Sequence, residues 1–170
     1  YSIKAQAHEY ELTETLVDSL VDDAIYQVKD LAQSRQMRLV QSFDDEPQFI
    51  MANQRLFTRM LVNLLVNAVR YGQPQTDIHI ALGHDTDTSA EALSDPTASP
   101  RPMVHITISN TVGDKTQNAQ PRQLASEGFG LGLVFVKTVI RKHLGEVRVD
   151  LPAMPGDTAR VECRIPNCEK

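Results

Sequence analysis

The glycine-rich stretch at residues 126–133 contains the residues whose types and spacing point most clearly to chemistry. Three glycines alternate there with apolar residues, in the order Gly128, Phe129, Gly130, Leu131, Gly132 and Leu133. Glycines at alternate positions let the backbone adopt positive φ and approach a ligand closely. Residues 134–143 predict a helix directly behind them, and a helix N-terminus presents unpaired N–H groups and a positive dipole end to an anion. The pattern is typical of a phosphate-binding loop, although plain turns before helices are also rich in glycine.

A pair of asparagines forms the second candidate site. Asn63 and Asn67 lie in a predicted helix at residues 59–72 and are four residues apart, so both amides leave the same face. Arg70 and Tyr71 lie one turn further along. The carbonyl oxygen of an amide suits Mg²⁺, which otherwise keeps several waters and binds nucleotide phosphates. Taken alone, the pair indicates two solvated surface amides, and the glycine stretch is what favours a metal site.

Together the two motifs resemble those of the catalytic, ATP-binding domain of bacterial two-component sensor histidine kinases, within the GHKL group of ATPases. The asparagine helix, with residues 54–56 leading into it, is similar to the N box of that family. Residues 128–133 are similar to its second glycine box, and residues 143–145 stand where it usually shows His-Gly-Gly. The resemblance runs in order from about Tyr10 to Ile165. It implies an α+β fold: a two-layer α/β sandwich (Bergerat fold), with a mixed, mostly antiparallel sheet and helices on one face.

The resemblance also implies an activity, namely donation of the ATP γ-phosphoryl group to a histidine on a separate dimerisation domain in two-component signal transduction. It implies ATP and Mg²⁺ as cofactors, with Asn67 as the metal ligand and Asn63 assisting. Arg70 stands where relatives often hold a lysine that contacts phosphate. In ATP-hydrolysing cousins a glutamate precedes the metal-binding asparagine by four residues, and Asn63 at this position disfavours hydrolysis as the main activity. The implied catalytic residues are Asn63, Asn67 and Arg70, and the implied nucleotide contacts are these three with Tyr71, Asn110, Gly128, Phe129, Gly130, Leu131, Gly132 and Leu133.

The first glycine box departs from the family pattern. The family usually shows Asp-x-Gly-x-Gly, in which the Asp accepts a hydrogen bond from the adenine amino group; here Asn110 replaces the Asp and Val112 the first Gly. Gly113, one position after Val112, could supply the glycine that the turn requires. An amide oxygen can still accept from an amine, but without the strength of a charged acceptor, so we expect weaker adenine binding. The alternative hypothesis is a degenerate domain that binds a nucleotide or a partner for regulation. A GHKL ATPase is the least favoured hypothesis.

The resemblance divides the chain into segments. Residues 1–9 are expected to be a linker from an absent dimerisation domain, and residues 10–167 to be the catalytic domain. Within it, residues 85–102 are polar and aperiodic and predict a mobile loop insert. Residues 111–127 predict a short ATP lid. His8 is assigned to the linker rather than to an acceptor site.

The apolar pattern predicts alternating elements. A short extended piece is expected near residues 10–12, followed by a helix from a cap at Thr13 or Thr15 to about Ser34. Its expected buried stripe is Leu16, Leu20, Ala24, Val28 and Leu31. Strands are predicted at residues 38–43, 49–52, 77–82 and 104–110, with a final hairpin of 146–151 and 158–165. By parity Asn110 shares the inward face of Val104, Ile106 and Ile108. His79 and His105 are expected to be solvated, and His143 to act as a cap or dipole partner rather than as a catalyst.

Bulk composition fits one globular domain. The 170 residues are 41% hydrophobic and 23% charged, and the formal net charge of −5 gives no electrostatic footprint for nucleic acid. No apolar stretch is long enough to span a bilayer. Cys163 and Cys168 lack metal spacing and are expected to be reduced. The start at Tyr1 suggests a fragment of a longer, homodimeric parent that is cytoplasmic or anchored in the inner membrane, with the receiver domain of a response regulator as a further partner.

Overall fold

A five-stranded sheet forms one layer of the molecule. The computed structural model describes residues 11–86, 102–114, 129–152 and 154–168. The sheet order is β2-β4-β5-β7-β6, and β2 pairs parallel with β4 while every other pairing in this sheet is antiparallel. The strands are β2 (Arg38–Phe43), β4 (Asp77–Thr86), β5 (Pro102–Thr111), β6 (Glu146–Asp150) and β7 (Thr158–Pro166). The predicted mixed, mostly antiparallel sheet is confirmed.

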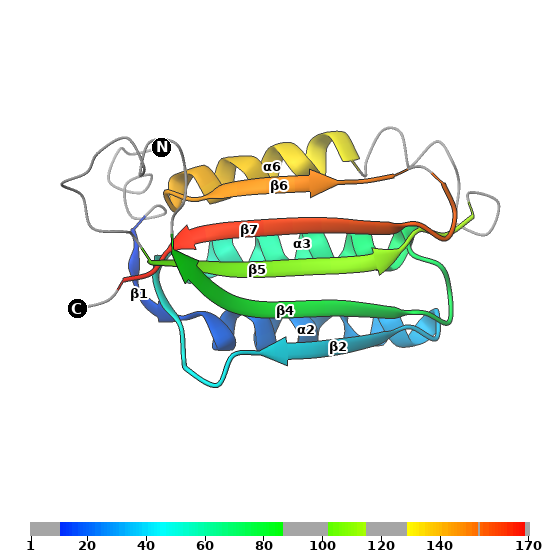
Figure 1. Ribbon diagram of the computed structural model, residues 1–170, viewed down its shortest axis with the longest axis horizontal. Helices are drawn as coiled ribbons and strands as arrows, with labels where there is room; N and C mark the ends of the chain where they lie inside the picture. The colour runs from blue at the N-terminus through cyan, green and yellow to red at the C-terminus, as the bar shows by residue number, and fades with distance from the viewer. Residues whose placement is uncertain (1–10, 87–101, 115–128, 153, 169–170) are drawn as a thin grey trace, which may run out of the picture.

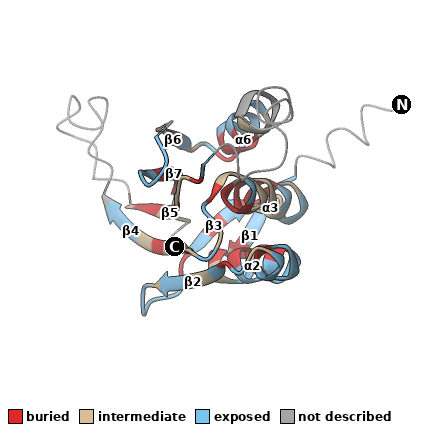
Figure 2. Cartoon of the chain, turned by 90° about the vertical axis from the view of Figure 1, so that its right-hand side faces the viewer, coloured by how far each residue is buried: buried red, intermediate tan, exposed pale blue. Residues whose placement is uncertain are grey.

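Three helices form the second layer and cover one face of the sheet (Figure 1). They are α2 (Val17–Ser34), α3 (Gln54–Tyr71) and α6 (Phe129–Lys142). Figure 2, turned by 90°, shows the sheet on one side and the helices on the other, with buried residues facing each other across the gap. The α+β sandwich predicted from the sequence is therefore confirmed.

The core lies between α3 and the central strands. Apolar residues of α3 recur at helical spacing, and the inward residues of β4 and β5 alternate with outward ones, so both buried faces meet. The buried residues of α3 are Phe57, Met60, Leu61, Leu64, Leu65, Ala68 and Val69. The inward residues of the two strands are Ile78, Ile80, Leu82, Val104, Ile106 and Ile108. This packing fixes α3 rigidly over the sheet.

The N-terminal helix begins later than the sequence predicts. Thr13 and Thr15 belong to strand β1 (Thr13–Leu16), which pairs antiparallel with β3 (Phe49–Ala52), and α2 starts only at Val17. β-branched threonines suit a strand, and pairing with β3 outweighs their capping tendency. The buried stripe of α2 continues to Ala32, while Leu31, predicted to be buried, is exposed. Successive buried residues from Ala24 are four positions apart, so Val28 is followed by Ala32 and not by Leu31.

Strands β4 and β5 are longer than predicted. Their pairing continues as far as Asp85 opposite Met103 and Thr86 opposite Pro102. The predicted loop insert therefore contributes residues to both strands at its ends. The rest of that insert, the linker at residues 1–9 and most of the ATP lid lie outside the described residues.

Charged side chains on the outer face of the sheet stabilise this extension. Arg164 donates to Asp85 at 2.8 and 3.0 Å, and His105 lies 2.7 Å from the same carboxylate and 3.5 Å from Glu162. Burial alone would raise the pKa of Asp85, but hydrogen bonds from Arg164 and His105 outweigh burial and lower this pKa. The expectation that His105 is solvated is wrong, whereas His79 is exposed as predicted.

Neither Cys163 nor Cys168 forms a disulfide within the part of the chain that the structure describes, in line with the expectation of reduced thiols, and burial raises the pKa of the Cys163 thiol to about 12. Within the described ranges, none of the helices combines the length and apolar character that crossing a bilayer requires.

Candidate functional site

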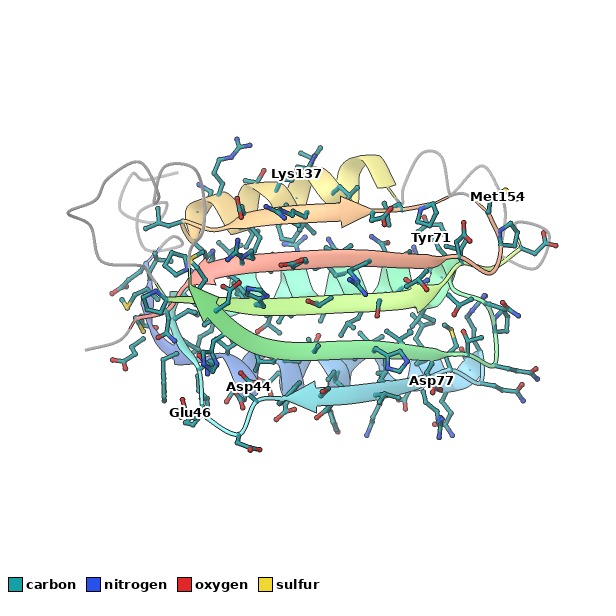
Figure 3. All side chains as sticks on the ribbon, in the orientation of Figure 1. Asp44, Glu46, Tyr71, Asp77, Lys137 and Met154 are labelled. Atoms are coloured by element: carbon teal, nitrogen blue, oxygen red, sulfur yellow. The ribbon has the colours of Figure 1, made fainter. Side chains whose placement is uncertain are left out.

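Three elements bring the predicted site residues to one end of the sandwich. The C-terminal end of α3, the C-terminal end of β5 and the first turn of α6 lie together at the right-hand end in Figure 1. Figure 3 labels Tyr71 there, at the end of α3, while Asp44 and Glu46 lie at the opposite end of the molecule. The fold therefore brings the end of the N-box helix, the end of the strand that carries Asn110 and the start of α6 into one region.

Helix α3 positions the two asparagines. Asn53 caps this helix by accepting a hydrogen bond from the Leu56 N–H at 3.0 Å, so the helix starts earlier than predicted, and Gly72 follows its last residue as expected. Asn63 and Asn67 are half-buried beside the apolar stripe, and Arg70 is exposed. Among the described residues, neither amide is engaged in a hydrogen bond. Both carbonyl oxygens are thus available to a ligand.

The donor set fits a metal that is shared with a nucleotide. In the described parts of the chain, no cluster of three or more His, Cys, Asp or Glu side chains could hold a metal ion on its own. Mg²⁺ often takes only one or two protein ligands together with phosphate oxygens and waters. The half-buried amides of Asn63 and Asn67 fit that limited role.

Asn110 lies at the end of β5 on the inward face, as the strand parity predicts. It is 9% exposed, opposite Ile78 on β4 and Ala159 on β7. Its Nδ2 donates to the Thr111 carbonyl at 3.2 Å. No described residue donates a hydrogen bond to its Oδ1, so the amide oxygen remains free to accept one.

Two glycines let the end of α3 approach the end of β5. A Cβ on Gly72 would lie 2.5 Å from the Ala68 carbonyl oxygen, 2.6 Å from Met37 Cε and 3.4 Å from Asn110 Nδ2. A Cβ on Gly113 would lie 2.9 Å from the Gly72 oxygen. Gly113 also donates its N–H to the Tyr71 carbonyl at 2.9 Å. Gly113 therefore serves the turn after Asn110, through close approach of the backbone.

Val112 fits into this turn although the family pattern has a glycine there. It forms a bridge with Gly72, its N–H donates to the Asp157 carbonyl at 2.7 Å, and its own carbonyl accepts from Gly156 at 2.9 Å. Because both backbone groups are paired, the substitution leaves the junction between α3 and β5 intact.

Helix α6 starts at Phe129, five residues earlier than predicted. Gly130 and Gly132 therefore lie in the first turn of the helix instead of in a loop before it, and Gly128 lies outside the described residues. Two helical glycines cost about 1 kcal/mol each, which the apolar packing of the rest of α6 offsets. Leu133 is half-buried. The unpaired N–H groups of this helix end thus belong to the glycine segment itself.

His143 connects the far end of α6 to the start of α3. It is 3% exposed, donates from Nδ1 to the Val139 carbonyl at 2.7 Å, and accepts at Nε2 from the Asn53 N–H at 3.0 Å. Its ring meets Phe57 edge-on at a centroid distance of 5.1 Å. Burial lowers its pKa, so the ring is neutral. His143 acts as a cap, as predicted, but the helix that it caps is α3. Because its ring is neutral, it does not interact as a cation with the dipole of its own helix.

Comparison with known proteins agrees with this geometry. Residues 52–168 match the sequence model of a family described as histidine kinase-, DNA gyrase B-, and HSP90-like ATPase. The adaptive-response sensory kinase SasA of Crocosphaera subtropica is 25% identical over 165 residues, which cover 97% of this chain and 41% of SasA. The probable sensor kinase SilS of Salmonella typhimurium is 27% identical over 133 residues, covering 78% of this chain and 25% of SilS. The chain thus spans less than half the length of these curated relatives.

Solved structures share the fold. The mycobacterial sensor histidine kinase MprB superimposes with a TM-score of 0.64 at 18% identity, covering 92% of this chain and 97% of the other. A nucleotide-free catalytic domain of the histidine kinase ThkA gives a TM-score of 0.66 at 17% identity, with the same coverage of 92% and 97%. These likenesses extend over both layers of the sandwich. Together with the sequence match, they show that the chain belongs to the family of histidine kinase-, DNA gyrase B- and HSP90-like ATPases.

Proposed function

We propose that this chain is the ATP-binding catalytic domain of a sensor histidine kinase. It would hold ATP while a histidine on a separate dimerisation domain attacks the γ-phosphorus and ADP leaves. The observation that carries the proposal is that the C-terminal end of α3, the helix of Asn63 and Asn67, meets the C-terminal end of β5, which carries Asn110, and the first turn of α6 (Figure 1).

Phosphoryl transfer requires mainly positioning and charge neutralisation from the protein. Bound Mg²⁺ would neutralise charge that develops on the phosphate oxygens. Asn67 would supply a carbonyl oxygen to that ion, with Asn63 one turn before it on the same face. Arg70 is exposed at the end of α3 and would contact phosphate, and Tyr71 lies beside it. The first-turn N–H groups of α6, from Phe129 onward, would bind phosphate oxygens.

Asn110 would recognise the base. Its free Oδ1 is an acceptor at the inner end of β5, suited to the exocyclic amino group of adenine. The bond lacks the charge assistance that an aspartate would add, so affinity for ATP is expected to be lower than with a carboxylate.

Hydrolysis is disfavoured because no general base occupies the position next to the metal ligand. Asn63 stands one turn before Asn67, and an amide cannot accept a proton from water at neutral pH. The acceptor nucleophile must then come from another domain. Proposed partners are the histidine-bearing dimerisation domain of the same homodimeric parent and the receiver domain of a response regulator, all in the cytoplasm where ATP is supplied.

A second candidate function is a regulatory domain that binds a nucleotide without transfer. Asn110 in the place of an acidic residue favours it. The paired backbone of Val112 counts against it, because the turn that would be damaged in a degenerate site is closed by hydrogen bonds.

A transfer assay separates the three functions. The chain is incubated with the dimerisation domain of the full-length protein and γ-labelled ATP, and both acid-labile label on the acceptor and free phosphate are measured. A kinase labels the acceptor, and phosphate release without the acceptor stays far slower. Phosphate release that needs no acceptor would indicate an ATPase, and binding without label or release would indicate the regulatory domain.

A further inference from the structure

A chain of hydrogen bonds connects Arg35, at the end of α2, with Asn110. The guanidinium Nη2 of Arg35 donates to the Gly72 carbonyl at 3.0 Å. The N–H of Gln73 donates to the Thr111 carbonyl at 2.8 Å. That same Thr111 oxygen accepts from Asn110 Nδ2 at 3.2 Å. Three segments far apart in the sequence thus meet through two carbonyl groups.

The middle of this path is a single rigid unit. The Gly72 carbonyl and the Gln73 N–H belong to the same planar peptide group, so fixing the oxygen also fixes the direction of the N–H. A cationic donor on the oxygen makes a stronger bond than a neutral one and polarises the N–H at the other side of the peptide. Arg35 therefore both orients and strengthens the bond to Thr111.

Further contacts hold Arg35 against this peptide. The Arg35 carbonyl accepts from the Gln75 N–H at 3.2 Å, so both side chain and main chain bind the connection between α3 and β4. Met37, two residues later, is buried with its Cε against Gly72, at the place where a Cβ would lie 2.6 Å away. The end of α2 is thus fastened to the backbone beside Asn110.

The orientation of the Asn110 amide decides which base the site accepts. An asparagine can present either an acceptor oxygen or a donor N–H₂, whereas an aspartate presents only acceptors. With Nδ2 bound to Thr111, Oδ1 is left for the ligand and suits a base with an amino group at C6. A released amide could turn and donate instead to a base with a carbonyl at C6.

We infer that Arg35 is a positioning residue for base recognition, which holds the Asn110 amide in its accepting orientation through the peptide of Gly72 and Gln73. The inference rests on the proposed function and deepens it. None of the Arg35 hydrogen bonds described above involves Asn63, Asn67, Arg70 or the first turn of α6. Loss of Arg35 therefore changes the preference for adenine over hypoxanthine more than the affinity for the triphosphate.

The test compares Mg·ATP with Mg·ITP, whose base has a carbonyl at C6, by calorimetric titration. Arg35→Met removes the donors and keeps an apolar stem. Arg38→Met is the matched control, because Arg38 is 79% exposed and pairs with Asp77 at 3.0 Å on the outer face of the sheet, whereas Asn110 faces inward. Arg35→Lys keeps a cationic donor and tests rescue. Thermal unfolding of each variant checks that it is folded.

We expect the wild type and Arg38→Met to prefer ATP over ITP. Arg35→Lys is expected to keep most of this preference. In Arg35→Met the ratio of the two affinities should fall roughly two- to ten-fold, the range for loosening one hydrogen bond. A purely structural role would lower both affinities together and leave the ratio unchanged. If Arg35→Met does not fold, Arg35→Gln, whose shorter side chain retreats from Gly72, should show the same fall.

The outcomes distinguish this inference from the proposed function. An unchanged ratio in folded Arg35→Met, with normal ATP binding by the wild type, overturns the positioning role alone. Equal binding of ATP and ITP by the wild type also overturns it, because the amide would then have no fixed orientation. Failure of the wild type to bind either nucleotide removes the proposed function, and this inference with it.

Discussion

His143 determines, at the scale of single residues, how α6 meets α3. Its neutral ring bonds the Asn53 N–H at the start of α3 while remaining attached to α6 through Val139. Protonation would place a hydrogen on Nε2, so this nitrogen could no longer accept a hydrogen bond. It would then be a donor facing the Asn53 N–H, which is also a donor. The burial that lowers the pKa of His143 therefore links the free energy of unfolding to pH.

We expect the free energy of unfolding to fall as pH drops from 7 to 5. With the pKa of His143 lowered in the folded state, the unfolded chain binds one proton more once pH falls below the ordinary histidine value of about 6.5. His143→Gln should cost about 1–3 kcal/mol at pH 7 and flatten this fall, whereas exposed His79→Gln should keep it. Urea unfolding at both pH values measures the difference, and an undiminished fall in His143→Gln would refute the link.

At the scale of elements, the end of α6 contains a strained residue. Leu144 follows His143 with a φ of +62° and is 74% exposed, so it occupies a left-handed conformation without gaining much burial. The next residue, Gly145, lies directly against the Arg164 carbonyl, where a Cβ would clash. Glycine at position 144, which the family motif usually has, would relieve the first of these constraints.

Leu144→Gly is expected to raise the free energy of unfolding by about 0.5–1 kcal/mol, because the cost of positive φ for a side chain exceeds the entropy that glycine adds to the unfolded chain. Leu144→Ala retains a Cβ and should give no such gain. Denaturant unfolding of the wild type and the two variants at neutral pH measures these differences in the free energy of unfolding. Destabilisation by the glycine variant would show that Leu144 contributes contacts that outweigh its strain.

The boundaries of the elements show what sequence patterns can predict. Strands with clean alternation, such as β5 around Val104, Ile106 and Ile108, were predictable in position and facing, and Asn110 followed from them. The extended piece before α2 was predicted too early, near residues 10–12, because β1 is set by the pairing of its threonines with β3. This pairing joins residues 33 to 39 positions apart, which no local pattern reveals. The start of α6 was missed because glycine propensity favours a loop, while tertiary packing supports a helix.

The whole molecule adds contacts that lie beyond any local motif. The resemblance predicted Asn63, Asn67 and Asn110 as site residues, and the fold brings the C-terminal ends of their elements, α3 and β5, to one end of the sandwich. Arg35 had no signal in the sequence, because its proposed role depends on one hydrogen bond to the peptide of residues 72 and 73. His105 was misassigned for a similar reason, since its carboxylate partners come from other strands.

The central claim, that this end of the sandwich holds a magnesium nucleotide, is tested most directly by calorimetric titration with a non-hydrolysable ATP analogue, with and without Mg²⁺. Wild type should bind more tightly with Mg²⁺, and Asn67→Ala should lose at least about ten-fold in affinity and most of the magnesium dependence. Gln27→Ala, which removes an exposed amide on α2, should bind like the wild type. Binding that is independent of both Mg²⁺ and Asn67, or no binding at millimolar nucleotide, would contradict the account.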